Sequence, residues 1–147
     1  MTTVQKVSLK SVYPIRHLVL RKEKPIESCY FVDDEKKSTL HFGVILEDKI
    51  VGVGSLFEQK NELINSKKQF QIRGMAILEE HHDKGFGTLL LHEIEAVCSA
   101  KKATTIWFNA REKAVVFYKK LGYEVTGKPF DIQGVGIHIV MKKTIKS

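Results

Sequence analysis

The feature that most constrains this chain is residues 69–96, where the spacing of apolar residues changes from that of a strand to that of a helix. Residues 70–78 become apolar on both sides of the chain, as in the central strand of a sheet. From residue 86 onward the apolar residues recur at helical spacing, at Phe86, Leu90, Ile94, Val97 and Cys98. The order predicts a central strand, a polar turn and an amphipathic helix.

The turn into this helix contains Lys84-Gly-Phe-Gly-Thr88, a sequence suited to hold an anion. The first N–H groups of a helix have no partner within the helix, and the helix dipole places positive charge there. The glycines lack the Cβ atoms that would keep a ligand oxygen away from the backbone. Residues 84–88 are therefore predicted to bind a phosphate group.

The rest of the chain predicts further helices and strands. Residues 11–21 carry Ile15, Leu18 and Val19 at i, i+3 and i+4 and are expected to form a helix, as are residues 114–121. Further strands are expected at 41–46 and 50–57, as a hairpin, and at 104–108, 123–125 and 137–141. The residues expected to divide the last two strands are Gly127, Pro129, Gly134 and Gly136.

This order of elements predicts a mixed α/β fold. The strand–helix–strand unit at its centre should be parallel, with a right-handed crossover. The phosphate loop then lies at the carboxyl end of a central strand, where ligands of open α/β sheets bind. With 147 residues and no linker or repeat, residues 1–147 are expected to form a single domain.

Composition and charge narrow the class of protein. A hydrophobic content of 43% and a charged content of 28% are typical of a globular protein. The net charge is +7, but the basic residues are scattered and interleaved with acids, which does not favour nucleic acid as a partner. Residues 1–10 contain no apolar signal core and no apolar run approaches membrane-spanning length. We expect a cytoplasmic protein that does not bind a membrane.

Neither the cysteines nor the histidines predict a metal site or a disulfide framework. Cys29 and Cys98 lie far apart without CxxC spacing. His81 and His82 are adjacent, and His92 lacks the partner of an HExxH motif. No metal is therefore expected in the chemistry.

Two common phosphate-binding motifs do not fit the loop. A triphosphate loop needs GxxxxGK[ST], and the only Gly-Lys pair, Gly127-Lys128, leads into Pro129. A dinucleotide fold needs GxGxxG and an acid at the end of the next strand. Here Leu90 stands at the third glycine position, and the next strand is expected to end at Asn109.

Residues 73–91 resemble the acetyl-CoA-binding motif of the GNAT superfamily of N-acetyltransferases, Q/R-x-x-G-x-G/A after a hydrophobic strand. Residues 109–123 are similar to its second signature, an asparagine followed by A-x-x-F-Y and L-G-F/Y. Residues 15–21 and 39–43 are similar to a bacterial branch of the superfamily, so the resemblance covers essentially the whole chain. His82 departs from the pattern by occupying the Q/R position.

The resemblance implies a mostly antiparallel mixed sheet with a parallel strand–helix–strand core, flanked by helices. It implies transfer of an acetyl group from acetyl-CoA to a primary amine, by direct attack in a ternary complex. Many relatives rich in strands form dimers, so a homodimer is also expected. The acceptor stays open among polyamine, amino acid, drug, peptide N-terminus and lysine side chain, because acceptor loops vary independently of the cofactor site.

The resemblance also assigns cofactor-binding residues. The backbone of Met75, Ala76 and Ile77 would pair with the pantetheine arm as if it were an added strand. The pyrophosphate would be held by the backbone N–H groups of Lys84, Gly85, Phe86, Gly87 and Thr88, with His82 or Lys84 adding a side-chain charge. Asn109 would contact the cofactor, although a turn or helix cap is an equal interpretation.

Tyr118 matches the family tyrosine that lies beside the cofactor sulfur. Aminolysis of a thioester expels a thiolate, and a phenol can donate the proton that this thiolate needs. The alternative is a core tyrosine, since Tyr118 stands on the apolar stripe between Ala114 and Leu121.

The general base is left open. Many relatives use a glutamate on the central strand, but residues 69–73 (Gln-Phe-Gln-Ile-Arg) contain no carboxylate, and Glu79 and Glu80 fall in a polar turn. Histidine is a side-chain type suited to proton transfer, and His138 follows a glycine kink that could aim it at the cleft, or it is a structural histidine. A water relay or an amine that arrives neutral would need no base. Arg73 could bind an anionic part of the acceptor or a buried acid.

Two other classes of function stay open. The chain could be a coenzyme A-binding module or sensor without turnover, since the usual carboxylate base is missing. A basic nucleic-acid-associated protein is compatible with the charge alone.

Overall fold

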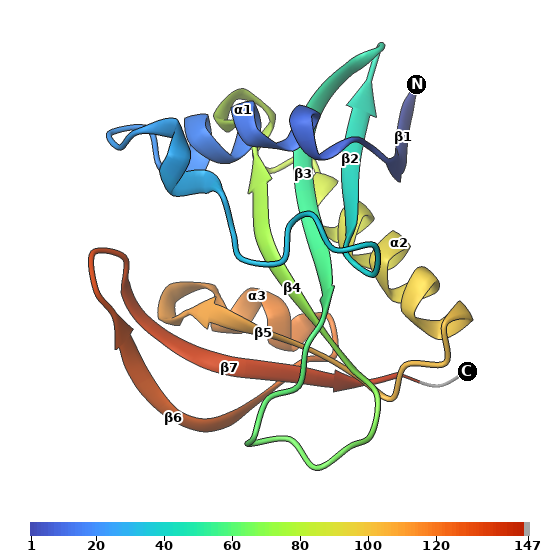
Figure 1. Ribbon diagram of the computed structural model, residues 1–147, viewed down its shortest axis with the longest axis vertical. Helices are drawn as coiled ribbons and strands as arrows, with labels where there is room; N and C mark the ends of the chain where they lie inside the picture. The colour runs from blue at the N-terminus through green and yellow to red at the C-terminus, as the bar shows by residue number, and fades with distance from the viewer. Residues whose placement is uncertain (146–147) are drawn as a thin grey trace. The chain divides into compact units, whose positions relative to one another are not determined.

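The computed structural model describes residues 1–145 and contains a seven-stranded sheet with helices (Figure 1). In chain order the elements are β1 (Thr2–Lys6), α1 (Leu9–Leu20), η1 (Ile26–Cys29), β2 (Leu40–Leu46), β3 (Lys49–Glu58), β4 (Gln69–Ile77), η2 (Glu79–His81), α2 (Phe86–Ala100), β5 (Thr105–Arg111), η3 (Glu112–Ala114), α3 (Val115–Lys120), β6 (Glu124–Ile132) and β7 (Gly136–Thr144).

The strands are hydrogen-bonded in the order β1-β2-β3-β4-β5-β7-β6. β4 pairs with β5 in parallel, and β1–β2, β2–β3, β5–β7 and β6–β7 are antiparallel. The predicted mixed α/β class, with a mostly antiparallel sheet around a parallel strand–helix–strand core, is confirmed. The described part of the chain divides into two compact units, residues 1–57 with 72–97 and residues 58–71 with the residues from 98 to 145. The expectation of a single domain stays a prediction.

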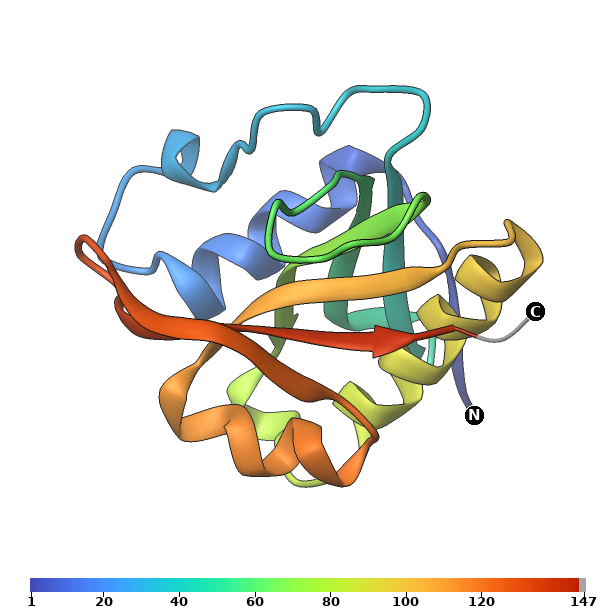
Figure 2. The same cartoon turned by 90° about the horizontal axis from the view of Figure 1, so that it is seen from below.

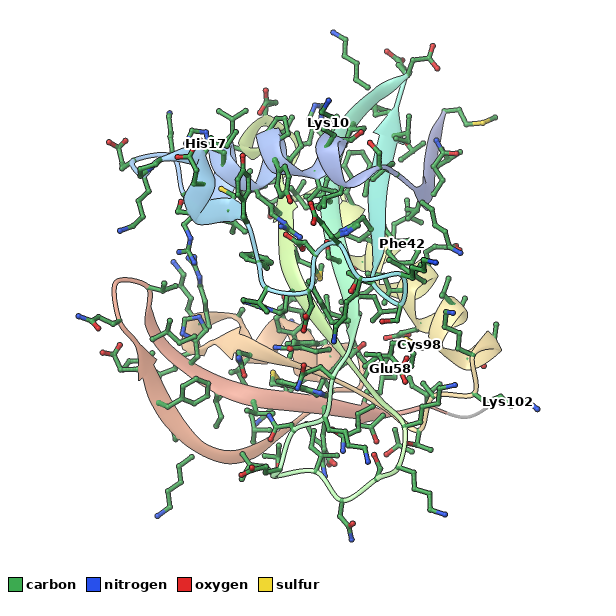
Figure 3. The ribbon with its side chains drawn as sticks, in the orientation of Figure 1. Lys10, His17, Phe42, Glu58, Cys98 and Lys102 are labelled. Carbon is green, nitrogen blue, oxygen red and sulfur yellow. The ribbon has the colours of Figure 1, made fainter. Side chains whose placement is uncertain are left out.

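In the first unit, α1 and α2 cover opposite faces of the strands (Figures 1 and 2). The hydroxyl of Ser8 caps α1 by accepting from the Ser11 N–H at 3.3 Å. Apolar side chains of α1 pack on β3 and β4 in a cluster of Val12, Ile15, Val53 and Ala76. Near its other end, His17, labelled in Figure 3, makes a 2.8 Å hydrogen bond between its Nε2 and the Lys24 carbonyl.

The other face of the first unit lies against α2. A Cβ atom at Gly54 of β3 would stand 3.2 Å from side-chain atoms of Leu90 and Met75 and 3.6 Å from Ile94. Leu90 and Ile94 are fully buried, as their helical spacing predicts. The predicted hairpin of β2 and β3 is confirmed, and Glu47 and Asp48 at its turn both have positive φ, as a type I′ turn requires.

In the second unit, β5 lies between β7 and residues 69–71 of β4. One face carries a cluster of Ile64, Trp107 and Val140, and the Trp107 Nε1–H donates to the Gln59 carbonyl at 2.8 Å. An aromatic group centred on Phe108 contains Tyr118 and Tyr123, with ring centroids 4.5 and 4.9 Å from that of Phe108. Side chains of β5 therefore fix α3 as well as the loop after β3.

Several predicted boundaries were wrong. The strand expected at 123–125 is β6, which runs through Gly127 and Pro129 to Ile132, and an irregularity between Thr126 and Phe130 accommodates both residues. The helix expected at 114–121 is a 3₁₀ turn followed by α3. β1 was not predicted, because it is short and mostly polar. No helix within residues 1–145 is both long and apolar enough to cross a membrane.

Candidate functional site

The start of α2 presents backbone N–H groups to open space. The N–H of Leu89 donates to the Gly85 carbonyl at 3.0 Å and is the first bond of the helix. The N–H groups of residues 86–88 have no acceptor within residues 1–145. A Cβ atom at Gly85 or Gly87 would meet no atom within 4 Å. Free donors at the positive end of a helix, beside glycines whose Cβ positions are open, are suited to a phosphate.

The two glycines of this loop differ in backbone conformation. Gly85 has φ +79° and follows Asp83 at +63°, so the chain reverses here in the left-handed region. A residue with a side chain is strained at Gly85. Gly87 lies within the helix and is not among the positive-φ residues. The backbone therefore requires glycine at position 85, whereas at 87 it does not.

The side chain of His82 holds the loop against β4. Its Nε2–H donates to the Ile77 carbonyl at 2.7 Å, while the ring stays exposed to solvent. Lys84 is also exposed, with its Nζ 3.3 Å from Nδ1 of His81. An imidazole N–H makes this bond whether or not the ring is charged, so the role needs no permanent cation. The charge beside the loop comes from Lys84.

The segment Met75–Ile77 follows a break in the regular geometry of β4. Gly74 has φ +66°, and a Cβ atom there would stand 3.0 Å from both Arg16 Nε and Phe31 Cε2. Ala76 is buried against α1, while Met75 lies near Gly54 on the α2 face. Side-chain packing thus fixes this segment on both faces. Whether its backbone pairs with a ligand stays a prediction.

Tyr118 combines a packed ring with an open hydroxyl. The ring centroid lies 4.5 Å from that of Phe108 and 5.1 Å from that of Phe117. In the described part of the chain the hydroxyl has no hydrogen-bond partner, and it is not a fully buried atom. Burial of the ring raises the pKa of Tyr118 above 10.0. Such a phenol keeps its proton at neutral pH and can donate it.

Asn109 is not at a strand end or helix cap. β5 continues to Arg111, and Asn109 pairs with Val140 across the ladder to β7. The cap interpretation is therefore wrong, because the strand is longer than its run of β-branched and aromatic residues. The Asn109 side chain is exposed, as contact with a ligand would require.

His138 is buried on β7, with 5% of its surface exposed. Its Nδ1–H donates to the Gly136 carbonyl at 2.8 Å, which leaves the lone pair on Nε2. Cross-strand partners share a face of a sheet, and neighbours along a strand alternate. Arg111 pairs with His138, and Phe108, which contacts Tyr118, lies three residues earlier. His138 and Tyr118 are therefore on opposite faces of the β5–β7 pair and do not meet.

The first unit also contains a buried ion pair that was not predicted. Arg16 is fully buried, and its Nη1 and Nη2 donate to the two oxygens of Asp34 at 2.7 and 3.0 Å. The same guanidinium donates to the Cys29 carbonyl and to the Ser55 hydroxyl, which lies 2.6 Å from Nδ1 of His41. Asp34 lies in an irregular segment, so no periodic pattern marks it as a partner of α1.

Comparison with known proteins shows a match over most of the chain. The family model described as the acetyltransferase (GNAT) domain matches residues 27–145. The Bacillus subtilis (strain 168) protein named uncharacterized N-acetyltransferase YitI is 34% identical over 147 residues, covering 100% of this chain and 99% of that protein. Glucosamine 6-phosphate N-acetyltransferase 1 of Dictyostelium discoideum is 27% identical over 115 residues, covering 76% and 72% of the two chains.

Solved structures share the fold at low sequence identity. The Escherichia coli ribosomal-protein-S18-alanine N-acetyltransferase has a TM-score of 0.75 at 16% identity, covering 100% of this chain and 96% of that chain. An aminoglycoside 6'-N-acetyltransferase complexed with coenzyme A has a TM-score of 0.76 at 14% identity, with 99% and 98% covered. Because the family model matches well over half of its residues, this chain belongs to the GNAT family of acetyltransferases.

Proposed function

We propose that this protein transfers an acetyl group from acetyl-CoA to a primary amine. The observation that carries the proposal is the start of α2, where the N–H groups of residues 86–88 have no acceptor among the described residues and the Cβ positions of Gly85 and Gly87 are open. Membership of the GNAT family and the coenzyme A-bound structural neighbour support the choice of ligand. The expected cytoplasmic location and homodimer stay predictions.

The binding roles follow from the chemistry of each segment. The pyrophosphate of coenzyme A takes hydrogen bonds from the N–H groups of residues 84–88, and Lys84 adds positive charge. The pantetheine arm pairs with the backbone of Met75, Ala76 and Ile77, and Asn109 contacts the same molecule. His82 acts by fixing the loop on the Ile77 carbonyl.

The reaction is a direct aminolysis of the thioester. The amine nitrogen bonds to the carbonyl carbon, the carbon–sulfur bond breaks, and the thiolate takes a proton from the Tyr118 hydroxyl. The proton that the amine loses passes to solvent, directly or through a base, and the Tyr118 phenolate regains a proton from solvent. The raised pKa of Tyr118 keeps this proton in place at neutral pH. His138 stays a candidate base through Nε2, and its position on the face opposite Tyr118 means that the two must act on different partners.

Binding and turnover are tested separately. Calorimetry of coenzyme A into the folded protein should give heat, and release of free thiol from acetyl-CoA should depend on an added amine. Absence of coenzyme A binding would contradict the proposal. Binding without thiol release across a broad amine panel would instead identify an acyl-CoA-binding module, an alternative that the lack of a carboxylate in residues 69–73 permits.

A further inference from the structure

Arg73 in β4 is a half-buried cation without an acidic partner. Among the described residues the ion pairs are Arg16–Asp34, Lys36–Asp33 and Lys142–Glu124, and Arg73 makes neither an ion pair nor a hydrogen bond. The only buried side-chain nitrogen without a partner in residues 1–145 is Nε of Arg16, so the guanidinium nitrogens of Arg73 reach solvent. The buried-acid interpretation of Arg73 is therefore excluded within residues 1–145.

Aromatic rings hold this guanidinium in place. Its central carbon lies 4.4 Å from the ring centroid of Phe31 and 5.6 Å from that of Phe57. Phe31 is itself fixed, because its N–H donates to Asp34 at 2.8 Å and Arg16 lies 4.0 Å from its ring centroid. A guanidinium stacked on rings keeps its N–H edge available, and that edge matches a carboxylate or phosphate in a bidentate arrangement.

The electrostatic setting favours an anion. Burial is the largest cause that lowers the pKa of Arg73, and the charges of Arg16 and Arg21 lower it further. Asp34 and Asp33 raise that pKa, but Asp34 is already bound to Arg16 with both oxygens, and Asp33 pairs with Lys36 at 3.5 Å. A cation that has lost part of its hydration without gaining a partner is stabilised by an incoming anion.

The face on which Arg73 lies separates it from the proposed phosphate loop. Phe57, like Val53 and Ser55, projects to the α1 side of β3, and the guanidinium of Arg73 lies over its ring. Met75 lies on the α2 side, and α2 begins at the loop. The arginine is thus available to a second molecule. Two residues of chain span at most about 7 Å, so the backbone of Arg73 lies within the length of a small metabolite from that of Met75.

We propose that Arg73 binds an anionic oxygen group of the amine acceptor, a carboxylate or a phosphate, and so selects acceptors that carry a negative charge near the amine. This rests on the proposed acetyl transfer. Polycationic amines should be poor acceptors for the same reason, because Arg73 is a cation without an ion-pair partner among the described residues.

The test compares matched acceptors and matched variants. Glucosamine 6-phosphate is paired with glucosamine, and glycine with glycinamide, so that each pair differs by one anionic group. In the wild type the anionic member of a pair should have the higher kcat/KM. Arg73→Gln should lower that value roughly tenfold or more through KM, as loss of charged hydrogen bonds does. The neutral member should change by no more than about twofold.

Arg21→Gln is the control, because Arg21 acts on Arg73 only through long-range charge. It should leave the preference nearly intact, while Arg73→Lys, which keeps the charge without the planar fork, should give an intermediate loss. Equal loss in Arg21→Gln and Arg73→Gln, or an unchanged preference in Arg73→Gln, would overturn the inference. Thermal melts followed by circular dichroism test whether each variant folds. If Arg73→Gln does not fold, Arg73→Lys decides the question.

A binding measurement separates this inference from the proposed function. Inorganic phosphate and acetate should each be tested for thermal stabilisation of wild type and Arg73→Gln, without acetyl-CoA. Stabilisation that depends on Arg73 supports the anion site even if no amine is acetylated. Because phosphate can also bind at residues 84–88 in both proteins, the oxyanion is identified by the probe that loses more of its stabilisation in Arg73→Gln. Stabilisation that is absent, or equal in the two proteins, rejects the site even if coenzyme A binds and turnover is normal.

Discussion

Replacing Gly87 by alanine should weaken coenzyme A binding without weakening the fold. A Cβ atom at this position meets no protein atom within 4 Å, and the backbone there is helical. The Cα–Cβ bond of a helical residue tilts toward the helix N-terminus, so the new methyl group points into the space where we place the pyrophosphate. A ligand oxygen would have to move away from the N–H groups beneath it.

The size of the effect follows from the bonds that would be lost. One hydrogen bond to a charged oxygen contributes about 1.5–3 kcal/mol, so the dissociation constant of coenzyme A should rise roughly 10- to 150-fold. The free energy of unfolding should rise by about 0.4–1 kcal/mol, because alanine replaces a glycine whose backbone angles it can adopt. That gain raises the Tm by a few degrees, roughly 1–4 °C for a domain of this size.

Isothermal titration calorimetry and thermal denaturation measure the two quantities on one sample. Glu93→Ala, at an exposed position further along α2, is the control and should leave coenzyme A affinity unchanged. Gly87→Ala that binds coenzyme A as tightly as the wild type would refute the phosphate site. A large loss of stability would refute the claim that only a ligand, and not the fold, requires glycine here.

Further substitutions test the remaining roles. Tyr118→Phe should lower kcat about 10²–10⁴-fold with coenzyme A affinity unchanged, and unchanged kcat at saturating amine would remove Tyr118 from the mechanism. Because the pKa of Tyr118 is raised above 10.0, wild-type kcat should lose this proton donor only above pH 10, and an alkaline limb near neutrality would need another group. His82→Ala should raise the coenzyme A dissociation constant roughly 2- to 10-fold, the value of one neutral hydrogen bond, while His82→Gln, which retains a donor, should restore it. Asp34→Asn should lower the free energy of unfolding by about 3–5 kcal/mol in urea, because it leaves the Arg16 charge buried without its counterion; a change below 1 kcal/mol would contradict that reasoning.

The sequence predicts those features that depend on neighbouring residues. Apolar spacing and turn residues located the hairpin, β4, the start of α2 and its bare N–H groups. The same reasoning failed where a residue far away in the sequence determines whether a side chain is buried. In α1, Leu18 was expected on the apolar face but is 54% exposed, whereas Arg16 is fully buried because Asp34, 18 residues later, neutralises it.

The sequence also does not predict on which face of a sheet a side chain lies when glycine-rich connections determine the strand register. Its position after a glycine kink made His138 a candidate base beside the reaction that Tyr118 would assist. The ladder between β5 and β7 places it instead on the opposite face. Asn109 was misplaced for a related reason, since pairing with β7 extends β5 beyond the residues with high strand propensity.

The buried ion pair explains how an irregular segment can support a selective site. Replacing such a pair by apolar residues is often neutral or stabilising, so the presence of Arg16 and Asp34 is not explained by stability alone. Their geometry suggests another role. Asp34 binds Arg16 with both oxygens and the Phe31 N–H with one, and Arg16 covers the Phe31 ring. The pair therefore fixes, in a segment without helix or strand, the ring on which Arg73 rests, and an arginine held in this way loses less freedom when it binds an anion.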